Sequence, residues 1–344
     1  MKKLTVLSIL LAFTLIISAC TGMSSTALTA NWHNRSDVEY DPDFYEELTY
    51  NVSYDDETAT NTNYCLKNIS GTYTVKVSAG VSLPTEDGGT LNELYKMETK
   101  LVLSGTYAKK DGEDIYAYTG DTVESVVYFH RLGGGYNMQP VKSETSYSLH
   151  APGRNSLSTV NISLVKYTVT MEYNDACSKV QYTVKDKTDE ISEIIPDDLK
   201  NYVVVEKAQD AEKTFSKLQK SYSYFDTAQL YFIGRGITYS ENSTNTVSTI
   251  PGNLAQNVKA QFTCSSISSR RYSFTDNNEE VTKDISSAEV SLKLNEGNSS
   301  GSAIKLYYAV GTQRNMLLSF EEPYSFGLGK LVYSLQNVST TKPE

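Results

Sequence analysis

The stretch LVLSGTYAKKDGEDIYAY, residues 101–118, decides the fold class of this 344-residue chain. Apolar and aromatic side chains, among them Tyr107 and Tyr116, flank the central Lys110-Asp111-Gly112-Glu113. An Asp-Gly pair provides the positive φ that a tight turn between two antiparallel strands requires. The stretch therefore predicts a β-hairpin.

Period-two alternation of apolar and polar residues extends outward from this hairpin. The alternation is clearest in Leu48, Tyr50, Val52 and Tyr54, and again in Tyr73, Val75, Val77 and Ala79. Further strands are predicted at 160–172, 178–186, 256–264, 270–276, 289–294, 303–309, 316–320 and 330–337. The 26 tyrosines, against ten phenylalanines and one tryptophan, favour half-buried sheet with one wet edge. We therefore expect a mainly β protein of antiparallel sheets.

Two apolar runs, 121–131 and 226–235, interrupt the β pattern. Each begins with aspartate, has Glu or Gln three residues later, and ends with arginine and glycine beyond it. These signals are typical of the two ends of a helix, so we expect a short buried helix in each run. A core strand is the alternative, because β-branched and aromatic residues dominate both runs. The 208–219 segment also has helical spacing.

The first 20 residues carry a targeting signal. Met1-Lys2-Lys3 is a short basic start, and residues 4–17 form an apolar run that is too short to span a bilayer. The run ends in Ile17-Ser18-Ala19-Cys20, which resembles a bacterial lipobox. The resemblance implies that Cys20 is lipidated and becomes the mature N-terminus. The alternative is an ordinary secretory signal followed by a cysteine by coincidence.

These features divide the chain into four expected parts: a lipoprotein signal peptide at 1–19, a lipidated tether at 20–45, a β-rich unit at 46–190, and a β-rich unit with short helices at 191–340. The boundary near 190 follows from an acidic, proline-containing passage. Asp121 and Asp226 lie 105 residues apart in similar contexts, which suggests that the two units are related by duplication.

The charge of the chain argues against a nucleic-acid partner. The net charge is −10, and removal of Lys2 and Lys3 with the leader makes it −12. A polyanion repels phosphate backbones, and the sequence has no long block of Lys and Arg. The same field keeps the body away from an anionic membrane surface, so membrane attachment is expected through the lipid on Cys20.

Cysteine and histidine are too few for a clear disulfide or metal framework. Cys65, Cys177 and Cys264 allow one bridge and leave one thiol over, so the pairing stays open. The chain has three histidines and neither a C-x-x-C nor an H-E-x-x-H motif. We therefore predict no metal site and no cofactor.

No catalytic residue is predicted either. The sequence has no Gly-x-Ser-x-Gly elbow, and the Ser-x-x-Lys match at Ser163 and Lys166 stands on a predicted strand. Acidic clusters at 41–47 and 55–57 lack the spacing of a defined calcium loop. We therefore expect a protein without enzymatic activity.

An apolar run at 226–235, then a polar passage, is followed by strand-like segments at 258–262, 272–274, 290–294, 304–309 and 329–335. This pattern resembles LolA-like and LppX-like envelope lipoproteins over roughly residues 200–340, with a fainter echo over 46–190. The resemblance implies a curved, half-barrel-like antiparallel sheet around short helices, with a hollow side that accommodates acyl chains. It places Leu230, Tyr231, Phe232 and Ile233 in or against that hollow, with plain core packing as the alternative. Arg131 and Arg235 are candidates to hold a lipid phosphate or carboxylate, or to cap their own helices.

The leading hypothesis is a lipid-anchored extracytoplasmic protein at the cell membrane that binds an apolar or amphipathic envelope ligand, or an envelope protein. The alternative is a surface adhesion or scaffold module whose sheets hold no cavity. A solute-binding component of a transporter ranks third, because such proteins usually alternate many strands and helices.

Overall fold

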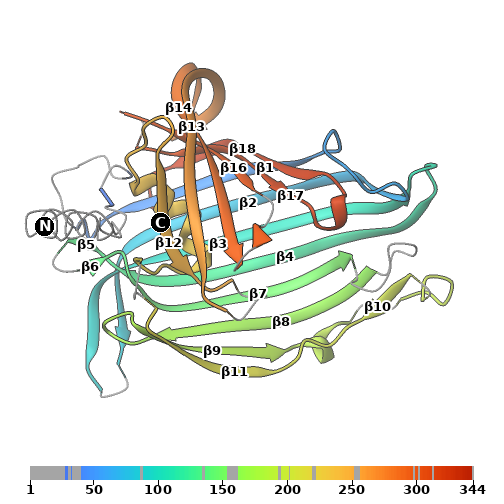
Figure 1. The fold of residues 1–344 in the computed structure, drawn as a ribbon, viewed down its shortest axis with the longest axis horizontal. Helices are drawn as coiled ribbons and strands as arrows, with labels where there is room; N and C mark the ends of the chain where they lie inside the picture. The colour runs from blue at the N-terminus through green and yellow to red at the C-terminus, as the bar shows by residue number, and fades with distance from the viewer. Residues whose placement is uncertain are drawn as a thin grey trace, which may run out of the picture.

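The computed structural model describes residues 28–29, 32, 40–85, 88–133, 136–152, 162–192, 195–200, 202–218, 222–251, 256–296, 299–300, 303–311 and 314–342. The expected signal peptide at 1–19 and the expected lipidation site Cys20 lie outside these residues and stay predictions. Most of the described residues form strands (Figure 1).

The strands are β1 (Tyr45–Asp55), β2 (Tyr64–Pro84), β3 (Thr90–Lys109), β4 (Asp114–His130), β5 (Leu132–Gly133), β6 (Tyr136–Asn137), β7 (Pro140–Pro152), β8 (Ile162–Tyr173), β9 (Lys179–Asp186), β10 (Val203–Val205), β11 (Ala211–Ser216), β12 (Thr244–Thr249), β13 (Val258–Asp276), β14 (Glu279–Glu296), β15 (Ser299–Ser300), β16 (Ile304–Ala309), β17 (Leu317–Pro323) and β18 (Lys330–Ser339). The helical elements are α2 (Leu230–Ile233) and the 3-10 turns η1 (Thr188–Glu190), η2 (Thr227–Gln229), η3 (Gly234–Gly236) and η4 (Ser325–Gly327).

Within the described residues, 16 strands join one sheet, in the order β11-β9-β8-β7-β4-β3-β2-β1-β18-β17-β16-β14-β13-β12, with β10 on β8 and β15 on β14. Most neighbours are antiparallel; the parallel pairs are β10 with β8 and β13 with β18. Strands from the expected units 46–190 and 191–340 therefore belong to the same sheet. They are joined where β1 meets β18, where β9 meets β11 and where β8 meets β10.

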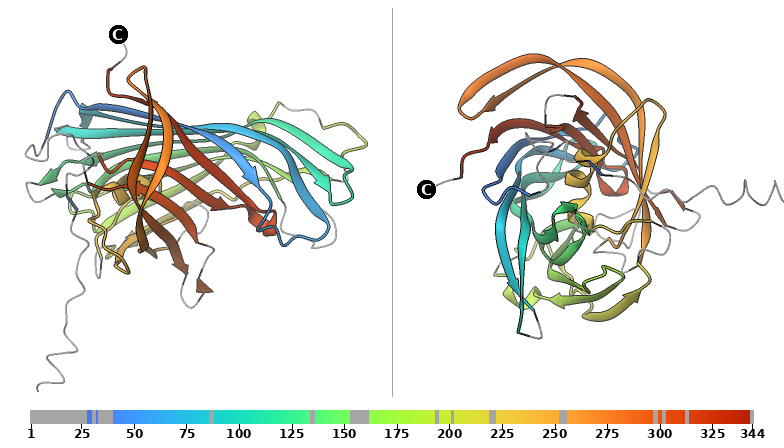
Figure 2. Two further views of the ribbon diagram at one scale, coloured as in Figure 1. Left: turned by 90° about the horizontal axis from the view of Figure 1, so that it is seen from above. Right: turned by 90° about the vertical axis from the view of Figure 1, so that its left-hand side faces the viewer.

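The sheet curves into a ring-like arrangement around the short helical segment. The β13–β14 hairpin crosses in front of the long strands β2, β3 and β4 (Figure 1), and its tip returns to β18, where Thr275 and Asp276 pair with Asn337 and Val338. Viewed along the long axis, the strands surround η2, α2 and η3 (Figure 2, right). The expected fold class, mainly β with curved antiparallel sheets and few short helices, is confirmed.

The hairpin predicted from residues 101–118 is the β3–β4 hairpin. Gly112 has φ +102°, the left-handed conformation that the turn requires. The strands predicted at 160–172 and 178–186 correspond to β8 and β9. The two strands predicted at 256–264 and 270–276 form one continuous strand, β13, with an irregularity after Cys264.

The prediction of a helix at 121–131 was wrong, because residues 121–130 form the second half of β4. Two of its apolar residues pair with β3: Val127 lies opposite Met97, and Phe129 lies opposite Tyr95. These cross-strand contacts outweigh the capping signal, since β-branched and aromatic residues fit a pleated surface. The local likeness of 121–131 and 226–235 is thus not repeated in the structure, where the first is strand and the second helix.

The helix expected at 208–219 was also wrong. Residues 211–216 form β11, which adds to the edge of β9 in the register Phe215 opposite Val180. The Phe215 ring packs edge-on against Tyr182 at 6.0 Å between centroids. An isolated helix of this length is marginally stable, whereas the exposed edge of β9 supplies partners for the backbone hydrogen bonds of β11, and this tertiary context decides the conformation.

The helix expected at 226–235 is confirmed as η2, α2 and η3. The Asp226 side chain accepts a hydrogen bond from the Ala228 backbone N–H at 2.9 Å, and Gln229 Oε1 accepts one from the Asp226 N–H at 3.1 Å. This pair forms the capping box that the sequence predicted. Gly234 lets the segment approach β16, because a Cβ there would collide with the Tyr308 hydroxyl.

Part of the expected tether packs on the folded body. Thr29 donates its backbone N–H to the Gly236 carbonyl at 2.8 Å, and Leu28 forms a bridge with Ile237. Trp32 is 2% exposed, and its ring lies 5.0 Å from Phe44 and 5.2 Å from Phe232 between centroids. The sequence favours a flexible tether here and leaves contact of Trp32 with the body as an alternative. At these described positions the alternative holds, because a large aromatic side chain gains more from burial than from solvation.

Candidate functional site

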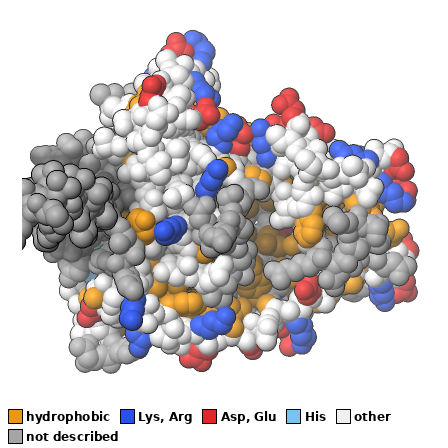
Figure 3. Space-filling view, in the orientation of Figure 1, with side chains coloured by type: hydrophobic (Ala, Val, Ile, Leu, Met, Phe, Trp, Pro, Cys, Tyr) orange, Lys and Arg blue, Asp and Glu red, His pale blue; other side chains and the backbone are white. Residues whose placement is uncertain are grey.

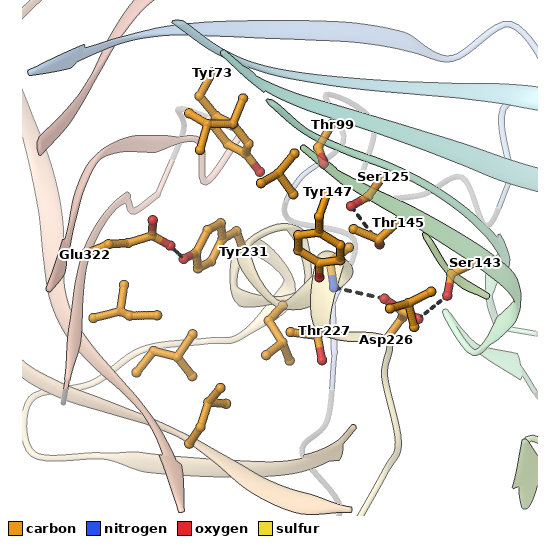
Figure 4. A pocket seen from close by; sticks show the side chains of 18 of the residues that line it. Tyr73, Thr99, Ser125, Ser143, Thr145, Tyr147, Asp226, Thr227, Tyr231 and Glu322 are labelled. Atoms are coloured by element: carbon orange, nitrogen blue, oxygen red, sulfur yellow. Dashed lines mark hydrogen bonds between the residues drawn. The ribbon is translucent and has the colours of Figure 1, made fainter. Parts of the chain in front are cut away.

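A cavity of about 300 Å³ lies between the concave face of the sheet and the short helical segment. Its walls come from β2, β3, β4, β7 and β8 on one side, from η2 and α2, and from β14, β16, β17 and β18 on the other (Figure 4). Hydrophobic side chains gather in a hollow at the centre of the face seen in Figure 3. The volume is at the lower end of the range for small-molecule sites.

The floor of the cavity is built from neighbouring rows of side chains that run across the strands. One row is aromatic and apolar: Tyr73 pairs with Leu101, Leu101 with Val123, and Val123 with Tyr147. Period-two alternation places these residues on the concave face. The row gives the cavity a flat apolar floor across four strands.

The next row carries hydroxyl groups. Thr99, Ser125 and Thr145 stand side by side on β3, β4 and β7 and all line the cavity. Thr145 Oγ1 donates to Ser125 Oγ at 2.9 Å (Figure 4). The row therefore brings hydrogen-bonding groups into an otherwise apolar floor.

Asp226 forms one polar end of the cavity and is 3% exposed. Besides capping the helix, its carboxylate accepts hydrogen bonds from Ser143 Oγ at 2.5 Å and from the Tyr173 hydroxyl at 2.7 Å. These donors compensate for the loss of water around the buried charge. The carboxylate also ties the helix to the strands β7 and β8.

Glu322 lines the opposite wall on β17 and is half-buried. It accepts hydrogen bonds from the hydroxyls of Tyr231 and Tyr333, the latter at 2.8 Å. Burial raises the pKa of this carboxyl above its ordinary value, although the two tyrosine hydrogen bonds oppose the shift. The site thus holds an acid in a wall made mainly of aromatic rings.

The tyrosines around the cavity are neutral hydroxyl groups. Burial raises the pKa values of Tyr73, Tyr147, Tyr231 and Tyr333 above the ordinary tyrosine value. Each therefore presents an apolar ring with one polar atom. Among the described residues that line the cavity, the charged side chains are Asp226 and Glu322, and none is cationic.

Of the four apolar residues at 230–233 that were expected at the hollow, two line the cavity and two do not. Leu230 and Tyr231 line the cavity. Phe232 and Ile233 point into the hydrophobic core, where they are 3% and 0% exposed. The two arginines lie elsewhere among the described residues: neither lines the cavity.

Arg235 is buried in an ion pair. Its guanidinium donates to both carboxylate oxygens of Glu46 and to the carbonyl of Arg314 at 3.1 Å. Arg131 lies after the end of β4 with its Nε 3.6 Å from Glu93 Oε2. Their positions favour structural ion pairs over contact with a ligand in this cavity.

Sequence reasoning missed most of the cavity wall. It did not identify Glu322, Tyr73 or the hydroxyl row, and it assigned Asp226 only a capping role. A usable signal was present for the hydroxyl row, because Thr99, Ser125 and Thr145 stand at inward positions of apolar alternating strands. Their assembly depends on strand register, which no single strand specifies.

A second buried polar cluster lies at the other end of β7. Asp121 and His150 are 4% and 5% exposed, with His150 Nδ1 2.6 Å from Asp121 Oδ1. The rings of Tyr116 and Tyr118 pack on the imidazole at 5.3 and 5.5 Å between centroids. None of these four residues lines the cavity described above.

The described residues hold neither a metal-binding cluster nor a membrane-spanning helix. They contain no group of three or more His, Cys, Asp and Glu side chains placed to hold a metal ion. In the same part of the chain, no helix has the length and apolar character needed to cross a membrane. Cys65 and Cys264 are thiols there rather than halves of a disulfide.

Comparison of the chain with protein-family models, with curated proteins and with solved structures found no match.

Proposed function

We propose that this protein is a lipid-anchored, extracytoplasmic binding protein, without enzymatic activity, that holds an apolar or amphipathic envelope ligand in the cavity between its curved sheet and the short helix. The single observation that carries the proposal is the cavity itself, about 300 Å³ in volume with a floor of aromatic and aliphatic side chains. A concave apolar site with a few polar groups is the usual form of a small-molecule site.

The arrangement of polar groups supports binding rather than catalysis. Asp226 and Glu322 are each held by hydroxyl donors from the protein itself. Carboxylates in such a setting serve to position neighbouring elements, since their lone pairs are already partly used. The resemblance to LolA-like and LppX-like lipoproteins is consistent with this assignment and remains part of the proposal.

The membrane partner is proposed from the N-terminal sequence. Lipidation of Cys20 would attach the protein by two long acyl chains, and each buried CH₂ contributes about 0.8 kcal/mol. The net charge of −10 favours neither an anionic membrane surface nor nucleic acid as a direct partner of the body. Replacing Cys20 with serine should abolish incorporation of labelled palmitate and release the protein from the membrane fraction; equal incorporation would refute the anchor.

The binding function is tested with the mature chain carrying Cys20→Ser. Native mass spectrometry should show co-purified lipid, and an uncharged apolar dye should bind. Val123→Trp fills the cavity floor and should abolish dye uptake. Val126→Trp is the matched control, because Val126 is half-buried on the opposite face of the same strand.

A clean apo mass together with no dye uptake would refute the binding function. It would favour the alternative in which the sheets present an adhesion or scaffold surface. Loss of dye uptake in both tryptophan variants would show that the dye does not report on this cavity.

A further inference from the structure

The charged side chains in the described cavity wall are all acidic. Asp226 and Glu322 contribute two carboxyl groups on opposite sides, and the described lining residues contribute no Lys, Arg or His. An anionic group entering this space would meet like charge without a compensating cation. In a site of low dielectric constant, such unpaired charge is strongly unfavourable.

The hydroxyl groups nearest to the two carboxylates do not offset this charge for a ligand. Tyr231 and Tyr333 already donate to Glu322, and Ser143 and Tyr173 already donate to Asp226. A hydroxyl has a single proton to donate, so the three of these groups that line the cavity, Ser143, Tyr231 and Tyr333, present lone pairs to an incoming molecule. The polar ends of the cavity are therefore acceptors.

Glu322 in particular retains acceptor capacity toward the cavity. A carboxylate offers about four lone-pair positions, and the two tyrosines occupy one on each oxygen. The side chain is half-buried and lines the cavity. A donor on a bound molecule has a direct partner here.

We propose that the cavity selects single-chain amphiphiles whose polar end donates hydrogen bonds and carries no negative charge, an alcohol or an amine, and that it rejects fatty carboxylates. Glu322 is the residue that determines this specificity. The inference rests on the proposed function, because it concerns the ligand of the same cavity.

The test uses the mature chain with Cys20→Ser and three probes of equal chain length: decanol, decylamine and decanoate. Each competes with an uncharged apolar dye at about pH 7. We expect decanol and decylamine to displace the dye at concentrations at least about tenfold lower than decanoate. Tighter binding of decylamine than of decanol would indicate an ion pair between the ammonium group and the carboxylates. Equal binding would indicate that the polar end forms hydrogen bonds without an ion pair.

Glu322→Gln removes the charge and keeps the shape, so we expect it to reduce the disadvantage of decanoate. Glu124→Gln, on an exposed side chain of β4, is the control and should leave the three concentrations unchanged. If Glu322→Gln does not fold, decanamide is compared with decanoate on the parent protein; it keeps the chain length, donates N–H and carries no charge, so it should displace the dye at lower concentrations than decanoate.

Three outcomes overturn the inference in distinguishable ways. Equal displacement by decanoate and decanol refutes charge selection and leaves the proposed binding function intact. An unchanged decanoate disadvantage in Glu322→Gln refutes the role of Glu322. Failure of all three probes and of the dye to bind refutes the proposed function and the inference together.

Discussion

The carboxylate of Asp121 holds His150 at the point where the β4–β7 ladder stops. Pairing of these strands ends at Thr122 opposite Ser148. Beyond it, the His150 backbone N–H donates to the Asp121 carboxylate at 3.1 Å, and His150 Nδ1 lies 2.6 Å from the same group. A buried side chain thus replaces the main-chain hydrogen bonds of the diverging strands, in the way that Asp226 ties Ser143 near the other end of β7.

Asp121→Ala should destabilise the protein by about 2–4 kcal/mol, because it leaves a buried N–H and an imidazole without their acceptor. The free energy of unfolding from urea denaturation measures the loss. Asp114→Ala is the control, since Asp114 is exposed and pairs with Lys67 across the surface; it should cost less than about 1 kcal/mol. Equal effects of the two substitutions would contradict the structural role of Asp121.

Arg235 links the end of the helical segment to β1 through Glu46, and both side chains are 2% exposed. Arg235→Ala leaves a buried carboxylate without this partner and should destabilise the protein by about 3–5 kcal/mol. Lys142→Ala removes an exposed ion pair with Glu172 and should have little effect. A small effect of Arg235→Ala in thermal or urea unfolding would show that Arg314, whose Nη1 lies 3.6 Å from Glu46, suffices to neutralise it.

Trp32 is the single tryptophan of the chain, so its fluorescence reports on the packed N-terminal segment. The folded protein should emit at short wavelength and shift to longer wavelength on unfolding, because the ring is buried among Phe44, Tyr95 and Phe232. Trp32→Ala should cost about 3–5 kcal/mol in unfolding free energy. If the folded protein emitted at the long wavelength of a water-exposed tryptophan, the packing of this segment on the body would be contradicted.

The raised pKa of Glu322 predicts a pH dependence of stability. The folded state holds this proton more tightly than the unfolded chain does. Stability due to the neutral carboxyl is therefore fully present below the unfolded pKa, about 4.3 for Glu, and is lost as the pH rises through the folded pKa. Urea denaturation at about pH 4 and about pH 7 should show the parent losing stability relative to Glu322→Gln. A constant difference between the two proteins would contradict the shifted pKa.

The strands were predictable where the local pattern agreed with the tertiary environment. Period-two alternation identified β8 and β9, and the Asp-Gly turn identified the β3–β4 hairpin. The helix prediction for residues 121–131 failed because their capping signals are local. The neighbours Tyr95 and Met97, which stabilise the strand, are distant in sequence. The helix prediction for residues 211–216 failed because pairing with the edge of β9 determines their conformation.

The cavity was less predictable than the fold. Leu230 and Tyr231 were identified from the resemblance to acyl-chain-binding lipoproteins, but Glu322 belongs to a strand that reaches the cavity only when β17 packs beside β18. The pairing of Thr99, Ser125 and Thr145 likewise requires three strands in register. Burial and charge at a site assembled from many strands are properties of the closed sheet.

The packed Leu28 sets the range over which the proposed anchor would let the body move. Only eight peptide steps separate Leu28 from Cys20, and a fully extended chain of that length reaches no farther than about 28 Å. A mature protein anchored through so short a segment would keep the end that carries Ile237 near the leaflet that holds the lipid of Cys20. Ligand exchange would then be confined to that leaflet and to proteins at the same surface. Such a protein would exchange its ligand at one membrane and would not carry it to another.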